Sequence, residues 1–410
     1  MIPSSEVGPV RVLMITQDLN IDRRIVQEAR SLAAAGYEVS IISRAAGTEN
    51  GRETVEGIPV ERVAVRGRDP RFSWLYRVGG VSRGSYVAAV FGVLIGRTTF
   101  LRLALPQAIS ARADVYHAHD LRNLELAYRA AQAAGGRLVY DAHELFPEVA
   151  ALPIRIRRRA WARLERRLAP HADLLITVNE LIARELSRRH GIAAPLVILN
   201  CADRPSGFDP RPGRYDLIRE RLGLPATTRI VLYEGGFSEF RGLENLVRSA
   251  RLLTGDAVLV LLGEGSLEPK LRRLAERESR GRVHFVEPVP QNELLSYAAS
   301  ADVGVIPYQP VDLNTYYSSP NKLFDYIQAA LPMVVNDLPY LRQLVTRHGL
   351  GVVAALRKPS DYAAAINSIL ESRVDLARFR ANLREVAPRY TWESQVPKFL
   401  AAYARVAPLM

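Results

Sequence analysis

The sequence predicts an α/β fold with two Rossmann-like units, each built on a parallel sheet that helices cover on both faces. Short apolar runs alternate with segments of helical periodicity along most of the chain, which is typical of parallel sheets because each parallel connection needs a crossover. The 410 residues are too many for one ordinary core. A stretch rich in Pro, Gly and Asp near residues 200–226 is predicted to join the two units.

The first unit begins with a strand and a helix. The apolar run at 10–16 is predicted to be a fully buried strand. Four apolar residues from Ile21 to Leu32 then recur at helical spacing, and Gly36 is predicted to end that helix. The alternation continues to residue 200. Further strands are predicted at 37–43, 113–119, 137–143, 173–179 and 195–200, with a helix at 121–136.

The second unit repeats the pattern. Its predicted strands lie at 229–236, 257–265, 282–288, 302–308 and 332–337. Its predicted helices lie at 241–253, 268–278, 291–301, 323–331 and 361–372, and a last helix at about 391–407 follows a break at Pro388. We therefore expect a first domain over 1–205 and a second over 206–391.

Composition and charge limit the class of protein. The chain is 48% hydrophobic and 24% charged, which is globular. Its net charge of +12 favours anionic partners, such as phosphorylated substrates, a membrane surface or nucleic acid. No nucleic-acid-binding module is recognisable, so nucleic acid is not expected as a partner. The single cysteine, Cys201, excludes a disulfide framework and fits a reducing compartment, so a cytoplasmic location is expected.

Two segments bear on membrane contact. The apolar run at 86–96 is about half the roughly 20 residues that a spanning helix needs, and it is predicted to be a buried or interfacial helix. The segment 155–168 is dense in arginine. Together they could rest on the inner face of an anionic plasma membrane; the alternative is that 155–168 is an ordinary solvated helix. The start of the chain lacks the pattern of a signal peptide.

Titratable residues gather at two strand ends of the first unit, where open parallel sheets bind ligands. They are His117, His119, Asp120, Asp141, His143 and Glu144. Alternate residues of a strand share a face, so the histidines of 113–119 point the same way. The favoured interpretation is a substrate site in which imidazoles and carboxylates bind hydroxyls. A metal site, or helix caps with satisfied core histidines, are the alternatives.

In the second unit, Gly235 and Gly236 follow a strand and let a ligand approach the backbone. Arg241 lies near the next helix start, where an anion is favoured; the alternative is a plain turn with a solvent-facing arginine. The stretch 263–268 lacks the third glycine of a dinucleotide fingerprint, and the chain has no P-loop motif. No nicotinamide cofactor is therefore expected.

A further candidate anion site lies at 318–322, Ser-Ser-Pro-Asn-Lys, just before a predicted helix. Serine hydroxyls, backbone N–H groups and the Lys322 ammonium could bind a phosphate there. Asp325 is three residues later on the same helix face, where a carboxylate can accept from two ribose hydroxyls. The alternative is a surface Lys–Asp pair of little consequence.

These segments resemble the retaining glycosyltransferases of family 4. LFDYIQAALPMVV is similar to the family's motif of two glutamates eight positions apart followed by Gly-x-Pro, with Asp325 at the second glutamate, Ala330 at the glycine and Pro332 at the proline. Further similar stretches are RRIVQEARSLAAAGYEVSII, DVYHAHD, LVYDAHELFPE, YEGGFSEFRGLENLV and VHFVEPVPQNELLSYAASADVGVIPY. The resemblance spans almost the whole chain, in order.

The resemblance implies the GT-B architecture, in which two Rossmann-like domains face each other across a cleft and the C-terminal helix, here within 392–410, packs back on the first domain. The second domain would bind a UDP- or GDP-linked sugar, and the first a glycan or lipid-linked acceptor. The implied catalytic residues are His119, Asp141 and His143. The implied donor-binding residues are Gly235, Gly236, Arg241, Val286, Pro288, Tyr317, Ser319, Asn321, Lys322, Leu323 and Asp325.

Within that scheme, Asp325 would hold the ribose, Arg241 and Lys322 would meet the diphosphate, and Val286–Pro288 would lie against the base. His119 would contact the transferred sugar. The chain has no Asp-x-Asp clamp for a metal–diphosphate complex, so we expect metal-independent transfer with retention of configuration and no cofactor. Such an enzyme would act in surface polysaccharide biosynthesis.

Two departures from the family pattern keep alternatives open. Tyr317 stands where the family has its first glutamate, which lies near the transferred sugar. Gly236 stands where an arginine often contributes one of two phosphate-binding cations, so Lys322 would have to compensate. A nucleotide-sugar epimerase and a non-catalytic protein that keeps the fold remain alternatives. A phosphorylase would need a lysine for pyridoxal phosphate, and no convincing one is present.

Overall fold

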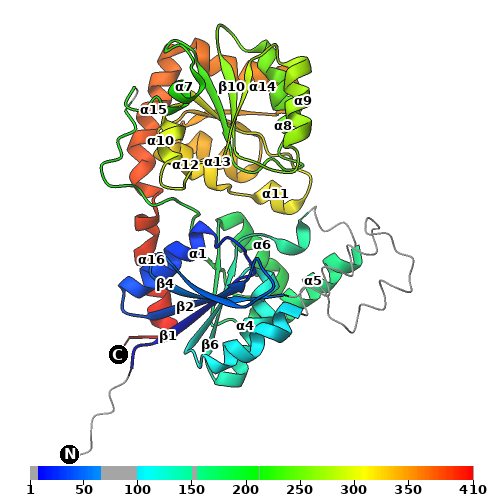
Figure 1. The fold of residues 1–410 in the computed structure, drawn as a ribbon, viewed down its shortest axis with the longest axis vertical. Helices are drawn as coiled ribbons and strands as arrows, with labels where there is room; N and C mark the ends of the chain where they lie inside the picture. The colour runs from blue at the N-terminus through cyan, green and yellow to red at the C-terminus, as the bar shows by residue number, and fades with distance from the viewer. Residues whose placement is uncertain (1–7, 66–98, 150–154, 212, 410) are drawn as a thin grey trace, which may run out of the picture. The chain divides into compact units, whose positions relative to one another are not determined.

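The computed structural model describes residues 8–65, 99–149, 155–211 and 213–409. These residues form two α/β units (Figure 1). The first contains the described residues up to Ile198 and those from Val396 onward, and the second runs from Leu199 to Gln395. The chain therefore leaves the first unit once and returns to it at the end.

The first unit is built on an eight-stranded sheet with the order β3-β4-β2-β1-β5-β6-β7-β8. All neighbouring strands are parallel except β3 and β4, which form an antiparallel pair at one edge. The central strands are buried, apart from the first residue of β1 and of β6, because helices cover both faces. The strands are β1 (Arg11–Ile15), β2 (Glu38–Arg44), β3 (Gly51–Val55), β4 (Ile58–Val63), β5 (Val115–His119), β6 (Arg137–Ala142), β7 (Leu174–Thr177) and β8 (Leu196–Val197).

Helices follow the strands of the first unit, and the two that follow β1 and β5 are those that the sequence predicts. The Asp22 side chain caps the first helix by accepting from the Arg24 N–H. The C-terminal helix ends beside the first strands of the chain (Figure 1), where the Tyr37 hydroxyl donates to the Ala407 carbonyl. The helices are α1 (Arg23–Ala34), α4 (Leu121–Ala134), α5 (Arg155–Leu168), α6 (Glu180–His190) and α16 (Trp392–Val406), and residues 99–110 are also helical.

The second unit is built on a six-stranded, wholly parallel sheet with the order β11-β10-β9-β12-β13-β14. Its core packs apolar residues of the sheet, among them Val231, Leu259 and Val305, against the flanking helices. The strands are β9 (Ile230–Glu234), β10 (Val258–Leu262), β11 (Val283–Val286), β12 (Val303–Ile306), β13 (Met333–Asn336) and β14 (Gly351–Ala354).

Helices cover both faces of this second sheet (Figure 1). They are α7 (Leu217–Leu222), α8 (Leu243–Ser249), α9 (Glu268–Glu278), α10 (Leu294–Ala299), α11 (Leu313–Tyr317), α12 (Asn321–Gln328), α13 (Pro339–His348), α14 (Pro359–Glu371) and α15 (Arg373–Val386). The fold class predicted from the alternation of strands and helices is confirmed in both units.

The predicted strands and helices that fall on described residues are present, and the prediction missed several others. It missed the β3–β4 hairpin, whose first strand is mostly exposed and carries no apolar run. It also missed β14, which is only half-buried, the helical residues 99–110, and the helices α6, α7, α11, α13 and α15. The predicted helix at 86–96 lies outside the described residues. Among the residues that the structure describes, no helix combines the length and apolarity needed to cross a bilayer.

The two sheet orders fix where ligand sites are expected. In the first sheet the strand order reverses between β1 and β5, and in the second it reverses between β9 and β12. Ligands of open α/β sheets bind at the carboxyl ends of strands beside such reversals. Ligands are therefore expected beside the residues that follow β1 and β5, with the adjacent end of β6, and beside those that follow β9 and β12.

Candidate functional site

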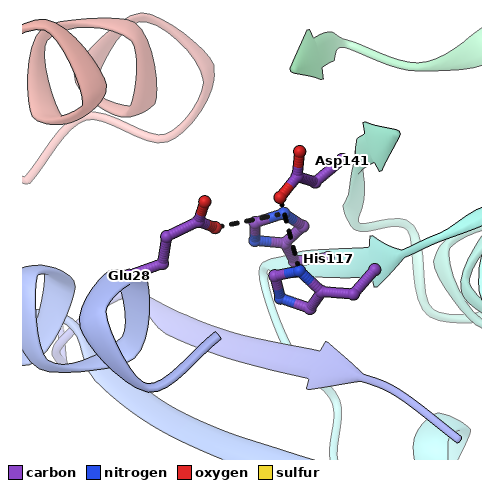
Figure 2. A group of neighbouring side chains, drawn as sticks. Glu28, His117 and Asp141 are labelled. Atoms are coloured by element: carbon purple, nitrogen blue, oxygen red, sulfur yellow. Dashed lines mark ion pairs between the residues drawn. The ribbon is translucent and has the colours of Figure 1, made fainter. Parts of the chain in front are cut away.

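Six polar side chains converge at the carboxyl end of the first sheet, and we call them the first-unit cluster. Helix α1 supplies two of them, β5 two, and β6 with the turn after it the other two. Figure 2 shows Glu28 of α1 and His117 and Asp141 of the neighbouring strands pointing toward one another. The cluster consists of Arg24, Glu28, His117, His119, Asp141 and His143.

Asp141 is the centre of the cluster. Both its oxygens accept from the Arg24 guanidinium, at 2.7 Å from Nε and 3.0 Å from Nη2. His143 Nε2 lies 2.9 Å from Asp141 Oδ2, and His119 Nδ1 lies 3.5 Å from the same oxygen. Arg24 also donates to the Ile198 carbonyl at 2.8 Å. One buried carboxylate therefore holds a guanidinium and two imidazoles in fixed positions.

His117 extends the cluster toward the C-terminal helix. Its Nδ1 lies 2.7 Å from the Tyr403 hydroxyl, and its Nε2 lies 3.7 Å from Glu28 Oε2. Its ring stacks on that of His119, with centroids 4.2 Å apart. All four side chains are buried, so α16 completes the packing behind His119.

The charges in the cluster follow from burial and from these neighbours. Burial raises the pKa of Asp141, but Arg24 and His143 outweigh it and hold that pKa well below its usual value. Burial and the Asp141 carboxylate raise the pKa of Glu28 well above its usual range. Burial lowers the pKa of His143, yet Asp120 and Asp141 raise it to about 10. At neutral pH, Asp141 is therefore ionised and His143 is protonated, whereas the raised pKa of Glu28 favours its neutral form.

The two strand histidines carry no charge at neutral pH. Burial is the main cause that lowers the pKa of His117 well below its usual value, and it also lowers that of His119. Within the part of the chain that the structure describes, Nε2 of each ring makes no hydrogen bond. A neutral imidazole nitrogen of this kind can bind a sugar hydroxyl.

Four members of the cluster could in principle ligate a metal ion. One ligand atom each from Glu28, His117, His119 and Asp141 lies within 4.8 Å of the others. Arg24, however, places its permanent positive charge 2.7 Å from Asp141 and 3.1 Å from Glu28. A divalent cation would be repelled by that guanidinium and would compete with it for both Asp141 oxygens. The donor set therefore fits a metal ion poorly.

The second unit has its own charged site, which we call the cation site, made of Arg241, Tyr308 and Lys322. Lys322 Nζ donates to the Tyr308 hydroxyl at 3.0 Å. The Arg241 guanidinium carbon lies 3.8 Å from the centroid of the Tyr308 ring. In the described residues, neither cation forms an ion pair with a carboxylate.

The glycine-rich turns that support the cation site are packed backbone against backbone. The Gly235 N–H donates to the Leu262 carbonyl, and the Gly263 N–H donates to the Val286 carbonyl. Gly263 has φ +140°, and a Cβ added there would lie 2.2 Å from the Gly235 oxygen. The stretch 263–268, which lacks the third glycine of a dinucleotide fingerprint, is thus glycine-rich because the neighbouring turn approaches it closely.

The predicted donor-binding residues differ in their neighbours and in their burial. Lys322 Nζ lies 3.4 Å from the position that a Cβ on Gly235 would occupy, so Lys322 and Gly235 are neighbours. Lys322 and Asp325 are both buried on α12, which excludes the surface-pair alternative. Gly236 and Asn321 are exposed at element ends.

The remaining predicted donor residues differ in exposure. The Leu323 and Val286 side chains are buried in the core, so only their backbones can face a ligand, while Ser319 is buried and Pro288 is exposed. Tyr317 ends α11, half-buried, with its ring 5.4 Å from that of Tyr316.

Sequence reasoning missed four residues of these sites. Arg24 and Glu28 were hidden in the predicted helix at 21–36, although two opposite charges four residues apart on a largely apolar face were a usable signal. Tyr308 closes the predicted strand 302–308, so its place at a strand end could have marked it. Nothing in the local sequence pointed to Tyr403.

Comparison with known proteins agrees with this fold. A family model described as "Glycosyl transferase 4-like domain" matches residues 21–202, and one described as "Glycosyl transferases group 1" matches residues 228–372. The D-inositol 3-phosphate glycosyltransferase of Thermomonospora curvata is 26% identical over 413 residues, covering 92% of this chain and 89% of that protein.

Two solved structures share the fold. Sucrose-phosphate synthase from Thermosynechococcus elongatus has a TM-score of 0.73 and 18% identity, covering 97% of this chain and 98% of its own. HepE from Anabaena, in complex with UDP and glucose, has a TM-score of 0.70 and 16% identity, covering 97% of this chain and 100% of its own. Two parallel-sheet units of this kind define the GT-B class of fold. The chain belongs to the glycosyltransferases of family 4 that the two models describe.

Proposed function

We propose that this chain transfers a sugar from a UDP- or GDP-linked donor to a glycan or lipid-linked acceptor, with retention of configuration and without a metal ion. The observation that carries the proposal is the cation site. Lys322 is buried and Arg241 half-buried, and neither pairs with a carboxylate in the described residues. Buried cations need a counter-charge, and a donor diphosphate supplies one. The UDP named with HepE supports a nucleoside diphosphate.

The nucleotide lies, in this proposal, along the carboxyl ends of the second sheet. Asp325 accepts from the ribose hydroxyls one turn after Lys322 on α12. Gly235 and Gly236 let the diphosphate approach the backbone after β9. Val286 and Pro288, at the end of β11, lie against the base.

The start of α12 and the end of α11 complete the donor site in this proposal. Ser319, Asn321 and the Leu323 backbone contribute polar groups at the start of α12. Tyr317, at the end of α11, lies beside the transferred sugar.

The chemistry proposed for these residues needs no protein nucleophile. The bond between the anomeric carbon and the diphosphate oxygen breaks, and Lys322 and Arg241 stabilise the charge that develops on the diphosphate. The acceptor hydroxyl attacks from the same face, and its proton passes to the departing diphosphate. His119, Asp141 and His143 act in binding: the neutral His119 imidazole contacts sugar hydroxyls, and Asp141 and His143 fix its position.

The acceptor class is proposed from the surface of α5. Four exposed arginines of this helix share one stripe, and none pairs with a carboxylate among the described residues: Arg159, Arg163, Arg166 and Arg167. Such a stripe fits the inner face of an anionic plasma membrane, where a lipid-linked acceptor for surface polysaccharide would lie. Cosedimentation with anionic vesicles, compared with neutral ones, tests it. Equal sedimentation of wild type and an Arg159→Gln/Arg163→Gln variant would exclude this role.

A phosphorylated polyol is a second candidate acceptor. The observation that favours it is the set of curated relatives named D-inositol 3-phosphate glycosyltransferase, including one from Catenulispora acidiphila that is 28% identical over 316 residues, covering 71% of this chain and 70% of that protein. Transfer assays should therefore include inositol phosphate beside polyprenyl-linked glycans. The acceptor that supports turnover decides between the two classes.

A thermal-shift screen is the first test of the donor proposal. UDP, GDP, ADP and CMP are added in turn, with and without EDTA, because a ligand of the native state raises its melting temperature. We expect one nucleoside diphosphate to stabilise the protein equally in both conditions. The shift should vanish in Lys322→Met and remain in Lys270→Met, whose lysine is exposed and paired with Glu244. Stabilisation that depends on a divalent metal would contradict metal-independent transfer.

Turnover then tests the site itself. Asp325→Ala is expected to abolish transfer, whereas Glu276→Ala, at an exposed position of α9, is expected to leave it unchanged. A folded Asp325→Ala variant with unimpaired turnover would refute the ribose assignment. Binding of a nucleotide-sugar without transfer to any acceptor would favour the non-catalytic alternative, and interconversion of free nucleotide-sugars would favour the epimerase.

A further inference from the structure

Tyr308 lies between Lys322 and Arg241, the two cations of the cation site. It lies two residues after the end of β12 and is 7% exposed. Its hydroxyl accepts a hydrogen bond from Lys322, and its ring carries the Arg241 guanidinium on one face. Lys322 Nζ also lies 4.9 Å from the centroid of the Tyr233 ring. One phenol thus contacts both groups through two different interactions.

The positive charges of Lys322 and Arg241 explain why a phenol is needed between them. Two positive charges held close together repel each other, and burial makes that repulsion stronger. Burial lowers the pKa of Lys322, but Tyr308 and Tyr233 raise it above its usual value, so the ammonium stays charged. The phenol oxygen and the electron-rich ring faces offset the repulsion before any anion arrives.

The backbone around Tyr308 is tied down on both sides. Its carbonyl accepts from Asn336 Nδ2 at 2.7 Å, which fixes the end of β12 to that of β13. The next residue, Gln309, donates its N–H to the Phe240 carbonyl at 3.0 Å, which fixes the turn that carries Arg241. Tyr308 is therefore a rigid support and not a mobile surface phenol.

We propose that Tyr308 is a positioning residue that holds Lys322 and Arg241 in the geometry that receives a diphosphate. Its hydroxyl takes one of the three Lys322 N–H groups and leaves the other two for the anion. Its ring keeps the Arg241 guanidinium in a fixed plane, in which Nε donates to Ser238 Oγ at 3.4 Å and the Nη atoms make no hydrogen bond among the described residues. The inference rests on the proposed donor site and goes beyond it by assigning a residue that binds no substrate atom itself.

Isothermal titration calorimetry with inorganic pyrophosphate, then with UDP and GDP, tests this role. Tyr308→Phe keeps the ring under Arg241 and removes only the hydroxyl. We expect it to weaken pyrophosphate binding about tenfold, the usual cost of losing one hydrogen bond to a charged group. Tyr308→Leu, which removes the ring as well, should weaken it further.

The matched control is Tyr326→Phe. Tyr326 is on α12 with Lys322, but its hydroxyl donates to the Leu232 carbonyl and contacts neither cation. This variant should bind pyrophosphate as wild type does. The affinity for UDP divided by the affinity for uridine separates two roles of Tyr308. If Tyr308 is merely structural, its substitution lowers the melting temperature and leaves this ratio unchanged. If Tyr308 positions the cations, its substitution lowers the ratio.

The outcomes separate this inference from the donor proposal. Wild-type affinity for pyrophosphate in Tyr308→Phe would overturn the positioning role. Pyrophosphate binding that depends on Tyr308, without binding of any nucleoside diphosphate, would support the positioning role and overturn the proposed donor. No binding of pyrophosphate or of any nucleoside diphosphate by the wild-type chain would overturn both.

Discussion

Glu28 and Asp141 are two buried carboxyl groups in one cluster, and the structure predicts opposite responses when each is made an amide. Asp141 is ionised and holds Arg24 and His143. Burial and Asp141 raise the pKa of Glu28 well above its usual value, which favours its neutral form. Asp141→Asn removes a charge, whereas Glu28→Gln keeps the shape of the favoured neutral form.

The two substitutions are expected to lower the free energy of unfolding by different amounts. Asp141→Asn leaves the buried Arg24 guanidinium without its counter-charge, and breaking a buried pair in this way costs roughly 3–5 kcal/mol of unfolding free energy. Glu28→Gln should cost about 1 kcal/mol or less, because no ionic interaction is lost. Both Glu28 oxygens already lack hydrogen bonds within the described residues.

The pH dependence supplies a second, independent readout. The folded chain holds the Glu28 proton more tightly than the unfolded chain, so the stability from Glu28 is fully present below its unfolded pKa of 4.5 and is lost as pH rises toward the folded value. The Glu28→Gln variant has no carboxyl group at this position, so it does not lose this stability as pH rises. The variant should therefore gain stability relative to wild type as pH rises above 4.5.

Urea unfolding, followed by circular dichroism between pH 4 and pH 8, measures both effects from the shift in midpoint at constant slope. Equal destabilisation by the two substitutions would show that Glu28 is ionised and that Arg24 depends on it as much as on Asp141. A Glu28→Gln variant whose stability relative to wild type does not change with pH would lead to the same conclusion.

Three further results are expected. Because Asp120 and Asp141 raise the pKa of His143 to about 10, its stabilisation is fully present below pH 6.5 and is lost as pH rises through 10; His143→Gln should remove that loss from urea midpoints. Tyr403→Phe leaves a buried imidazole nitrogen without its partner and should cost about 1–3 kcal/mol by thermal unfolding. Gly263→Ala should cost at least about 2 kcal/mol in calorimetry, whereas Gly47→Ala, in open space, should cost nothing measurable.

The fold could be predicted from the sequence because buried parallel strands appear as continuous apolar runs. β1, β9 and β10 are nearly or completely buried along their length and were therefore visible. The edge strand β3 is mostly exposed, and its pairing with β4 depends on a turn and not on apolar residues. Sequence periodicity carries no signal for such a strand.

The sites could be predicted only in part, for a related reason. His119 and Asp141 stand at strand ends, and strand ends can be read from the sequence. Arg24 reaches Asp141 across 117 positions of the chain, and Tyr403 reaches His117 across 286. Contacts of that kind arise from tertiary packing, and no local pattern encodes them.

The two units differ in whether their buried cations have carboxylate partners, and this difference supports the kind of ligand proposed for each. In the first unit, Arg24 pairs with Asp141, His143 lies between Asp141 and Asp120, and the histidines of β5 are neutral. In the second, Lys322 and Arg241 have a phenol between them and no carboxylate partner among the residues described. A site whose cations are already paired fits neutral hydroxyls, whereas a site with unpaired cations requires an anion. In the proposed function, the phosphorylated ligand is therefore expected at the second unit and the sugar hydroxyls at the first.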